Sequence, residues 1–132
     1  MIGIVIVAHG GLAREYLAAV EHVVGIQPGV VAVSIEDNHD RGSKQAEICT
    51  AADDVDKGDG VVVVTDLFGG SPSNLSLLAC QPENRRILYG MNLPMLIKLA
   101  KSRQLAVPDA VKGALEAGRK YIDSVNVRPD PG

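Results

Sequence analysis

The chain has 132 residues, close to the length of one domain, and 46% of them are hydrophobic, so a single sizeable core is expected. A formal net charge of −3 and only 3% aromatic residues provide neither the basic field nor the stacking platform of a nucleic-acid-binding protein. Cys49 and Cys80 lie far apart in sequence and outside any metal-type spacing, which favours ordinary thiols in a reducing compartment.

The apolar opening reaches His9 after too few residues for a signal core or a membrane span, and it has no basic leader. We therefore expect a cytoplasmic protein. Residues 1–127 are expected to form one domain, followed by a short C-terminal tail at 128–132.

The first half of the chain predicts two strands, each followed by a helix. The apolar, β-branched runs at 2–8 and 30–35 are typical of strands buried on both faces, as in a parallel sheet. Between them a helix is expected to stop at Gly25, with its apolar face formed by Leu12, Tyr16, Val20, Val23 and Val24. A second helix, with a less regular pattern, is expected at 43–57.

The second half continues the alternation of strands and helices. Strands are expected at 61–65 and 87–89, and helices are expected to begin at Ser71-Pro72, at Leu93-Pro94 and near Pro108. The last helix carries Val111, Leu115 and Ile122 at helical spacing. The pattern predicts βαβ crossovers and an α/β fold, a doubly wound, mainly parallel four-stranded sheet with helices on both faces. Residues 125–127 could add a short last strand, on an edge or paired with another subunit.

Chemistry is expected at the carboxyl ends of these strands, where doubly wound sheets bind their ligands. The first strand ends in Ala8-His9-Gly10-Gly11, which presents an imidazole beside two glycines. Asp66 directly follows the third strand and opens a glycine loop that runs into a helix N-terminus at Ser71. If the first and third strands are neighbours, His9 and Asp66 meet.

A contact between His9 and Asp66 would suit phosphoryl transfer. A carboxylate that accepts one ring N–H fixes the tautomer and leaves the other ring nitrogen free as a nucleophile. It also stabilises the more positive ring that forms when the nucleophile takes a phosphoryl group. Gly69, Gly70 and Ser71 offer backbone N–H groups and a hydroxyl at a helix N-terminus, which favours an anion. Such a site would need no metal and no cofactor.

Each of these residues alone has a simpler interpretation. A single histidine after a strand is more often an ordinary polar residue, Asp66 could accept loop N–H groups, and Ser71 could only cap a helix. The joint placement of His9 and Asp66 on two strand ends favours the functional interpretation. His22 is expected on the surface or half-buried within a helix. His39 is a competitor, ranked lower because the carboxylates around it favour the protonated, non-nucleophilic ring.

Three segments together resemble the mannose-type IIA (EIIA) domain of the bacterial phosphoenolpyruvate-dependent sugar phosphotransferase system (PTS). They are Ala8-His9-Gly10, the Thr-Asp-Leu-Phe-Gly-Gly-Ser-Pro-Ser-Asn stretch at 65–74, and the Met-Asn-Leu-Pro-Met-Leu stretch at 91–96. The resemblance covers almost the whole chain. It implies that His9 is phosphorylated through Nε2 by the phosphohistidine of the carrier protein HPr, and that Asp66 orients its ring.

The same resemblance assigns the remaining site residues. Gly69, Gly70 and Ser71 match the loop beside the phosphoryl group. Phe68, at a position where many members carry Trp, keeps an apolar wall of the cleft, and Asn92 and Pro94 match the turn into the fourth helix, which borders the same cleft.

The resemblance also implies an assembly and partners. The family sheet has the order 2-1-3-4, with an antiparallel fifth strand exchanged within a homodimer, which would give residues 125–127 a role. Transport members often continue into a IIB domain, whereas this sequence ends at Gly132, so we expect a separate IIB protein or a regulatory target as acceptor. The membrane would be reached only indirectly, through a permease complex.

Three other functions are alternatives for this site. One is the phosphocarrier subunit of a dihydroxyacetone kinase, which resembles this family in fold and histidine. From a different class, an anion- or nucleotide-binding module would hold its ligand in the glycine loop and would not need His9. A His-Asp-Ser hydrolase is disfavoured because Ser71 precedes a proline at a helix start and no separate oxyanion-hole signal accompanies it.

Overall fold

Four apolar runs form the strands of one parallel sheet. The computed structural model describes residues 1–67 and 71–128, without the side chains of residues 72 and 73. The strands are β1 (Gly3–His9), β2 (Val30–Ile35), β3 (Val61–Thr65) and β4 (Arg85–Leu88). They lie in the order β2-β1-β3-β4 and every neighbouring pair is parallel, which confirms the predicted fold class and the strand order.

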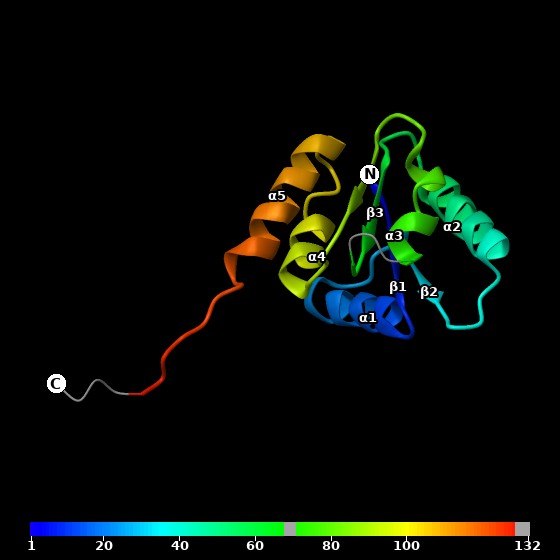
Figure 1. Cartoon of the computed structure of the whole chain (residues 1–132). Helices are drawn as coiled ribbons and strands as arrows, with labels where there is room; N and C mark the ends of the chain where they lie inside the picture. Colours follow the sequence, from blue (N-terminus) through cyan, green and yellow to red (C-terminus); the bar gives the residue numbers. More distant parts are fainter. Residues whose placement is uncertain (68–70, 129–132) are drawn as a thin grey trace.

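Helices cover both faces of this sheet (Figure 1). The elements are α1 (Leu12–Val24), α2 (Arg41–Val55), α3 (Ser71–Leu75), α4 (Leu93–Ala100), α5 (Val107–Lys120) and a short 3-10 helix, η1 (Leu78–Cys80). One core cluster packs α1, α4 and α5 on one face, and a second packs α2, α3 and η1 on the other. Alternate residues of β1 belong to the two clusters, so this nearly continuous apolar strand buries side chains on both faces of the sheet.

Two elements, α2 and β4, begin earlier than predicted because polar side chains extend them. Helix α2 begins before residue 43, where the carboxylate of Asp40 caps it by accepting a hydrogen bond from Ser43 N–H at 2.8 Å. Strand β4 covers Arg85–Leu88 instead of 87–89. The Arg85 side chain is only 7% exposed there, and it pairs with Asp53 at 2.9 Å and Asp56 at 3.1 Å. These ion pairs let a charged residue occupy a covered strand position.

The end of the chain departs further from the prediction. Helix α5 stops at Lys120, so the placement of Ile122 on its apolar face is wrong, and that side chain is 74% exposed. The prediction of a further edge strand within this chain is also wrong, because residues 121–128 run away from the sheet (Figure 1). Val125 and Val127 are 81% and 85% exposed. Pairing of this segment with another subunit stays a prediction.

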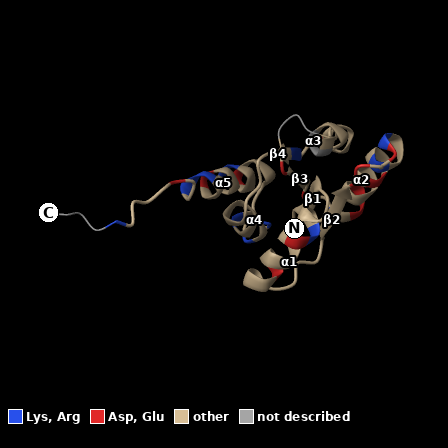
Figure 2. Ribbon diagram, turned by 60° about the horizontal axis from the view of Figure 1, so that its bottom comes forward, with Lys and Arg blue, Asp and Glu red and all other residues tan. Residues whose placement is uncertain are grey.

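Charge is confined mainly to the helices and loops. Figure 2 shows residues of both signs along α2 and α5, whereas β1, β2 and β3 carry neither Lys, Arg, Asp nor Glu. Within the described residues, none of the helices combines the length and the apolar character needed to cross a membrane.

The core makes a direct prediction for stability. Leu99 on α4 is completely buried, so Leu99→Ala should lower the free energy of unfolding by about 2–5 kcal/mol through lost burial and a residual cavity. Leu105→Ala is the matched control, because Leu105 is 50% exposed and should lose less than half as much. Urea titrations followed by circular dichroism measure both variants. Equal losses would contradict the assignment of Leu99 to the core.

Candidate functional site

The ends of β1 and β3 bring His9 and Asp66 into contact. Val7 of β1 pairs with Thr65 of β3, so the residues that follow them leave the sheet together at its carboxyl end. His9 Nδ1 lies 2.8 Å from Asp66 Oδ2, and the backbone N–H of His9 donates to the same oxygen at 3.1 Å. The predicted meeting of these two residues is confirmed.

This contact determines which ring nitrogen of His9 is free. An ionised carboxylate can only accept hydrogen bonds, so we assign the ring proton of neutral His9 to Nδ1. Nε2 then keeps its lone pair. The His9 side chain is 47% exposed while that of Asp66 is 13% exposed, so a buried anchor holds a ring that another molecule can reach.

Asp66 is anionic at neutral pH. Burial alone would raise its pKa, but the hydrogen bonds from the ring and backbone of His9 outweigh burial and lower the pKa below its ordinary value. The second oxygen, Oδ1, is buried and accepts no hydrogen bond from any described residue. Among the described residues, His9 is therefore the main group that stabilises the negative charge of Asp66.

Thr65 is a supporting residue that the sequence did not single out. Its side chain is fully buried, and Oγ1 donates to the carbonyl of Leu88 at 3.4 Å, which ties the ends of β3 and β4 together. The sequence signal for this role was a hydroxyl side chain directly after the four valines at 61–64. It holds the strand end from which Asp66 projects.

The predicted phosphate loop can be followed only in part. Phe68, Gly69 and Gly70 lie outside the described residues, so their assigned roles stay predictions. Ser71 is half-buried and begins α3.

Asn92 and Pro94 lie at the start of α4. Met91 N–H donates to Thr65 O at 3.1 Å, which ties the turn into α4 to the end of β3. Asn92 Oδ1 accepts from Met95 N–H at 3.0 Å, Asn92 Nδ2 donates to Gly118 O of α5 at 2.8 Å, and Pro94 lies in the first turn. Asn92 thus caps one helix and joins it to another, and the cleft roles of both residues remain predicted.

The other two histidines have different surroundings. His22 is exposed in the last turn of α1, and His39 Nδ1 lies 2.5 Å from the backbone carbonyl of Glu36. All three histidines are among the described residues, and His9 is the one whose ring contacts a carboxylate within ion-pair distance. The geometry therefore favours His9 as the nucleophile candidate.

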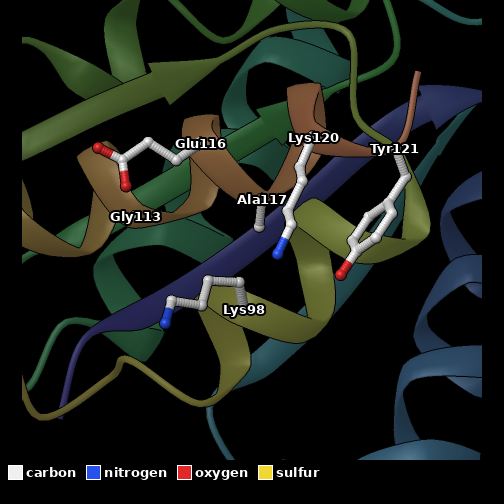
Figure 3. Close-up of a pocket in the computed structure, with 6 residues that line it drawn as sticks. All are labelled: Lys98, Gly113, Glu116, Ala117, Lys120 and Tyr121. Atoms are coloured by element: carbon white, nitrogen blue, oxygen red, sulfur yellow. The ribbon is translucent and has the colours of Figure 1, made fainter. Parts of the chain in front are cut away.

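Metal-ligating side chains are not clustered among the described residues, and a surface hollow between two helices does not include His9. Within residues 1–67 and 71–128, no three His, Cys, Asp or Glu side chains are grouped to hold a metal ion. A hollow of about 360 Å³ lies between α4 and α5, where Lys98, Lys120 and Tyr121 border it (Figure 3), and its lining includes neither His9 nor Asp66.

Comparison with known proteins places the chain in a family. The EIIA-man family model, described as "PTS system fructose IIA component", matches residues 3–116. The chain belongs to this EIIA family. The resemblance to mannose-type EIIA domains is therefore confirmed.

Relatives of this EIIA chain include a protein named as an EIIAB component and one named as an EIIA component. The mannose-specific EIIAB component of Escherichia coli K12 is 27% identical over 131 residues, which cover 97% of this chain and 41% of that protein. The chain thus spans about two fifths of the length of that relative. The sorbose-specific EIIA component of Lacticaseibacillus casei is 26% identical over 125 residues, 93% of this chain and 90% of that protein.

Solved structures share the fold of this EIIA chain. Component EIIA from Streptococcus agalactiae superposes with a TM-score of 0.84 at 28% identity, covering 94% of this chain and 97% of that one. The mannose/sorbose-specific IIA subunit from Enterococcus faecalis has a TM-score of 0.86 at 23% identity, with 97% of each chain covered.

The lowered pKa of Asp66 predicts how stability depends on pH. A carboxylate with a lowered folded-state pKa contributes stability above its unfolded value, near pH 4, and loses it as the pH falls through the folded-state pKa. We expect Asp66→Asn to lose about 0.5–1 kcal/mol near pH 6, and the difference from the parent protein to shrink near pH 3. Urea midpoints at both values test this. Asp37→Asn, an exposed carboxylate in the loop after β2, is the control, and a gap that widens in acid would refute the assignment.

Proposed function

We propose that the protein is a PTS phosphocarrier that accepts a phosphoryl group on His9 from phospho-HPr and passes it to a second protein. The observation that carries the proposal is the contact of Asp66 with Nδ1 of His9, which leaves Nε2 as the reactive atom. Membership of the EIIA family supports the same role.

The transfer needs little beyond positioning and charge. Nε2 of His9 attacks the phosphorus of the donor phosphohistidine in line, a new P–N bond forms, and the donor P–N bond breaks with its electron pair returning to the donor ring. Asp66 stays anionic and balances the positive charge of the phosphorylated ring. Gly69, Gly70 and Ser71 are proposed to hold the phosphoryl oxygens at the start of α3. The reverse reaction delivers the group to the acceptor.

The acceptor is proposed to be a separate IIB protein or a regulatory target. A IIB acceptor would connect the carrier to a permease in the membrane, while the carrier itself works in the cytoplasm. The relatives are named for mannose and for sorbose, so a sugar of this kind is the proposed class of cargo.

We propose a homodimer through the C-terminal segment. Strand β4 pairs with β3 and is the last described strand on its side of the sheet, so its outer edge is a place where a further strand could add. A groove of about 420 Å³ follows this edge, lined partly by Leu88, Val111 and Leu115. Val125 and Val127, two positions apart and highly exposed, suit a strand that adds to this edge in a partner.

Phosphorylation is directly testable by intact mass. Incubation with phosphoenolpyruvate, enzyme I and HPr should add one acid-labile phosphate, about 80 Da, because Nε2 of His9 accepts a single group. His9→Ala should gain none, and His39→Ala should behave as the parent protein. If the parent protein gains no phosphate, the carrier proposal is overturned and an anion-binding module is favoured. If the phosphoryl group passes to a dihydroxyacetone kinase instead of a IIB protein, the chain is the phosphocarrier subunit of that kinase.

The positioning role of Asp66 has its own test. Asp66→Asn should fold but transfer at least about tenfold more slowly, because the amide can direct its NH2 at the ring and select the wrong tautomer. Rapid-quench measurements of phosphoryl transfer from phospho-HPr give the rate, with Asp37→Asn as the matched carboxylate control. An unchanged rate would remove Asp66 from the mechanism.

A further inference from the structure

Arg103 is a buried cation with no carboxylate partner among the described residues. It lies just after α4 and is 3% exposed. Nε donates to the carbonyl of Ile2 at 2.7 Å, and Nη1 donates to Oε1 of Gln27 at 3.4 Å. Both acceptors are neutral, and burial lowers the pKa of the guanidinium. Within the described residues, the charge of Arg103 therefore lacks a counterion.

Arg85 is a second arginine whose side chain is largely covered. The Arg85 side chain is 7% exposed and contacts the carboxylates of Asp53 and Asp56, and these contacts raise its pKa despite burial. Burying a guanidinium without such a partner is costly. The contrast indicates that a further group is needed beside Arg103.

Arg103 forms part of the lining of a cavity. This cavity has a volume of about 400 Å³ and lies where β1 and β2 begin and α2 ends, at the amino end of the sheet, opposite to His9. A Cβ built on Gly29, which has a φ of +80° and lines this cavity, would stand 2.6 Å from Nη2 of Arg103. The missing side chain at Gly29 thus leaves room for Nη2 at the cavity wall, where no described residue accepts its hydrogen bonds.

We propose that this cavity binds a small monocarboxylate with an apolar body. The planar fork of a guanidinium matches a carboxylate through two parallel hydrogen bonds. Pro28, Val31 and Val55 form an apolar part of the wall, which suits a short aliphatic group. The proposal does not depend on phosphorylation of His9.

The charges around the cavity favour a monoanion. Lys57, Asp54 and Arg103 line it together with Met1, whose N-terminal ammonium pairs with Asp59 outside the lining. With that pair neutral, two positive groups face one negative group and the balance is a single positive charge. A ligand with one negative charge neutralises this balance, whereas a phosphate dianion would add unpaired charge beside Asp54.

Butyrate is the probe for this site, with butyramide as its neutral analogue of the same shape. In the full chain, labelled with ¹⁵N and titrated at constant ionic strength, butyrate should cause saturable shifts of the Gly29 and Val31 amide resonances. Butyramide should cause none, and His9→Ala should bind butyrate as the parent protein does. Absence of saturation, equal binding of butyramide, or tighter binding of inorganic phosphate would overturn the proposal.

A pair of lysine variants separates the site from general charge effects. Lys57→Glu reverses an exposed charge on the cavity lining and should weaken butyrate binding roughly fivefold, about 1 kcal/mol. Lys112→Glu makes the same charge change on an exposed residue of α5 that does not line this cavity, and it should leave binding unchanged. Equal weakening by both variants would overturn the site.

Arg103→Gln gives the direct test of the guanidinium. It should abolish saturable binding of butyrate, and binding that persists in this variant would overturn the proposal. Arg103 also fixes the chain before β1, because its carbonyl accepts from Ile2 N–H at 2.9 Å while Nε donates to Ile2 O. If the variant does not fold for this reason, the two lysine variants decide.

Discussion

The pairing of β1 with strands on both of its sides is the constraint on which the rest of the structure depends. β1 bonds to β2 along one edge and to β3 along the other, and helices cover both of its faces. Every backbone and side-chain position from Ile4 to Ala8 is therefore buried. Only the last residue of the strand, His9, leaves this enclosure. The buried strand thus holds the half-exposed ring of His9 in a fixed position at the carboxyl end of the sheet.

Asp66 illustrates how opposing forces are balanced at the exposed end of that strand. Burial favours the neutral acid, while two hydrogen bonds from His9 favour the carboxylate, and the hydrogen bonds prevail. One of these bonds comes from the backbone and does not depend on the ring. The backbone bond would therefore hold the carboxylate in place during the proposed transfer, in which the ring of His9 takes up and releases a phosphoryl group.

The two ends of the sheet differ in how charge is handled. At the carboxyl end an acidic group is compensated by the histidine it orients, and on β4 Arg85 is compensated by two aspartates of α2. At the amino end, the partners of Arg103 among the described residues are neutral oxygens, and Arg103 helps to line a cavity. The full strand length separates the two ends of a parallel sheet, so a ligand at Arg103 would not compete directly with a partner at His9.

Local chemistry let the sequence determine most elements. Runs of β-branched residues predicted the strands at 30–35 and 61–65, and the spacing of apolar residues predicted the helix that begins at Leu12. Proline in the first turn predicted where α4 begins. The strand ends also identified the His9 and Asp66 pair, because parallel topology brings the carboxyl ends of neighbouring strands together. These inferences succeeded because each rests on residues close in sequence or on a general rule of the fold.

Only the tertiary structure decided the features that depend on distant partners. It fixed the 2.8 Å contact of His9 with Asp66, and it extended β4 to Arg85 because two aspartates about 30 residues earlier neutralise that side chain. It ended α5 before Ile122, and it left the side chains of Val125 and Val127 highly exposed instead of packed against the described part of the chain. It also buried Arg103 against Ile2, a contact that spans 101 positions of the chain. Periodicity cannot reveal such contacts, because the energy of a buried charge is set by whichever groups the fold places around it.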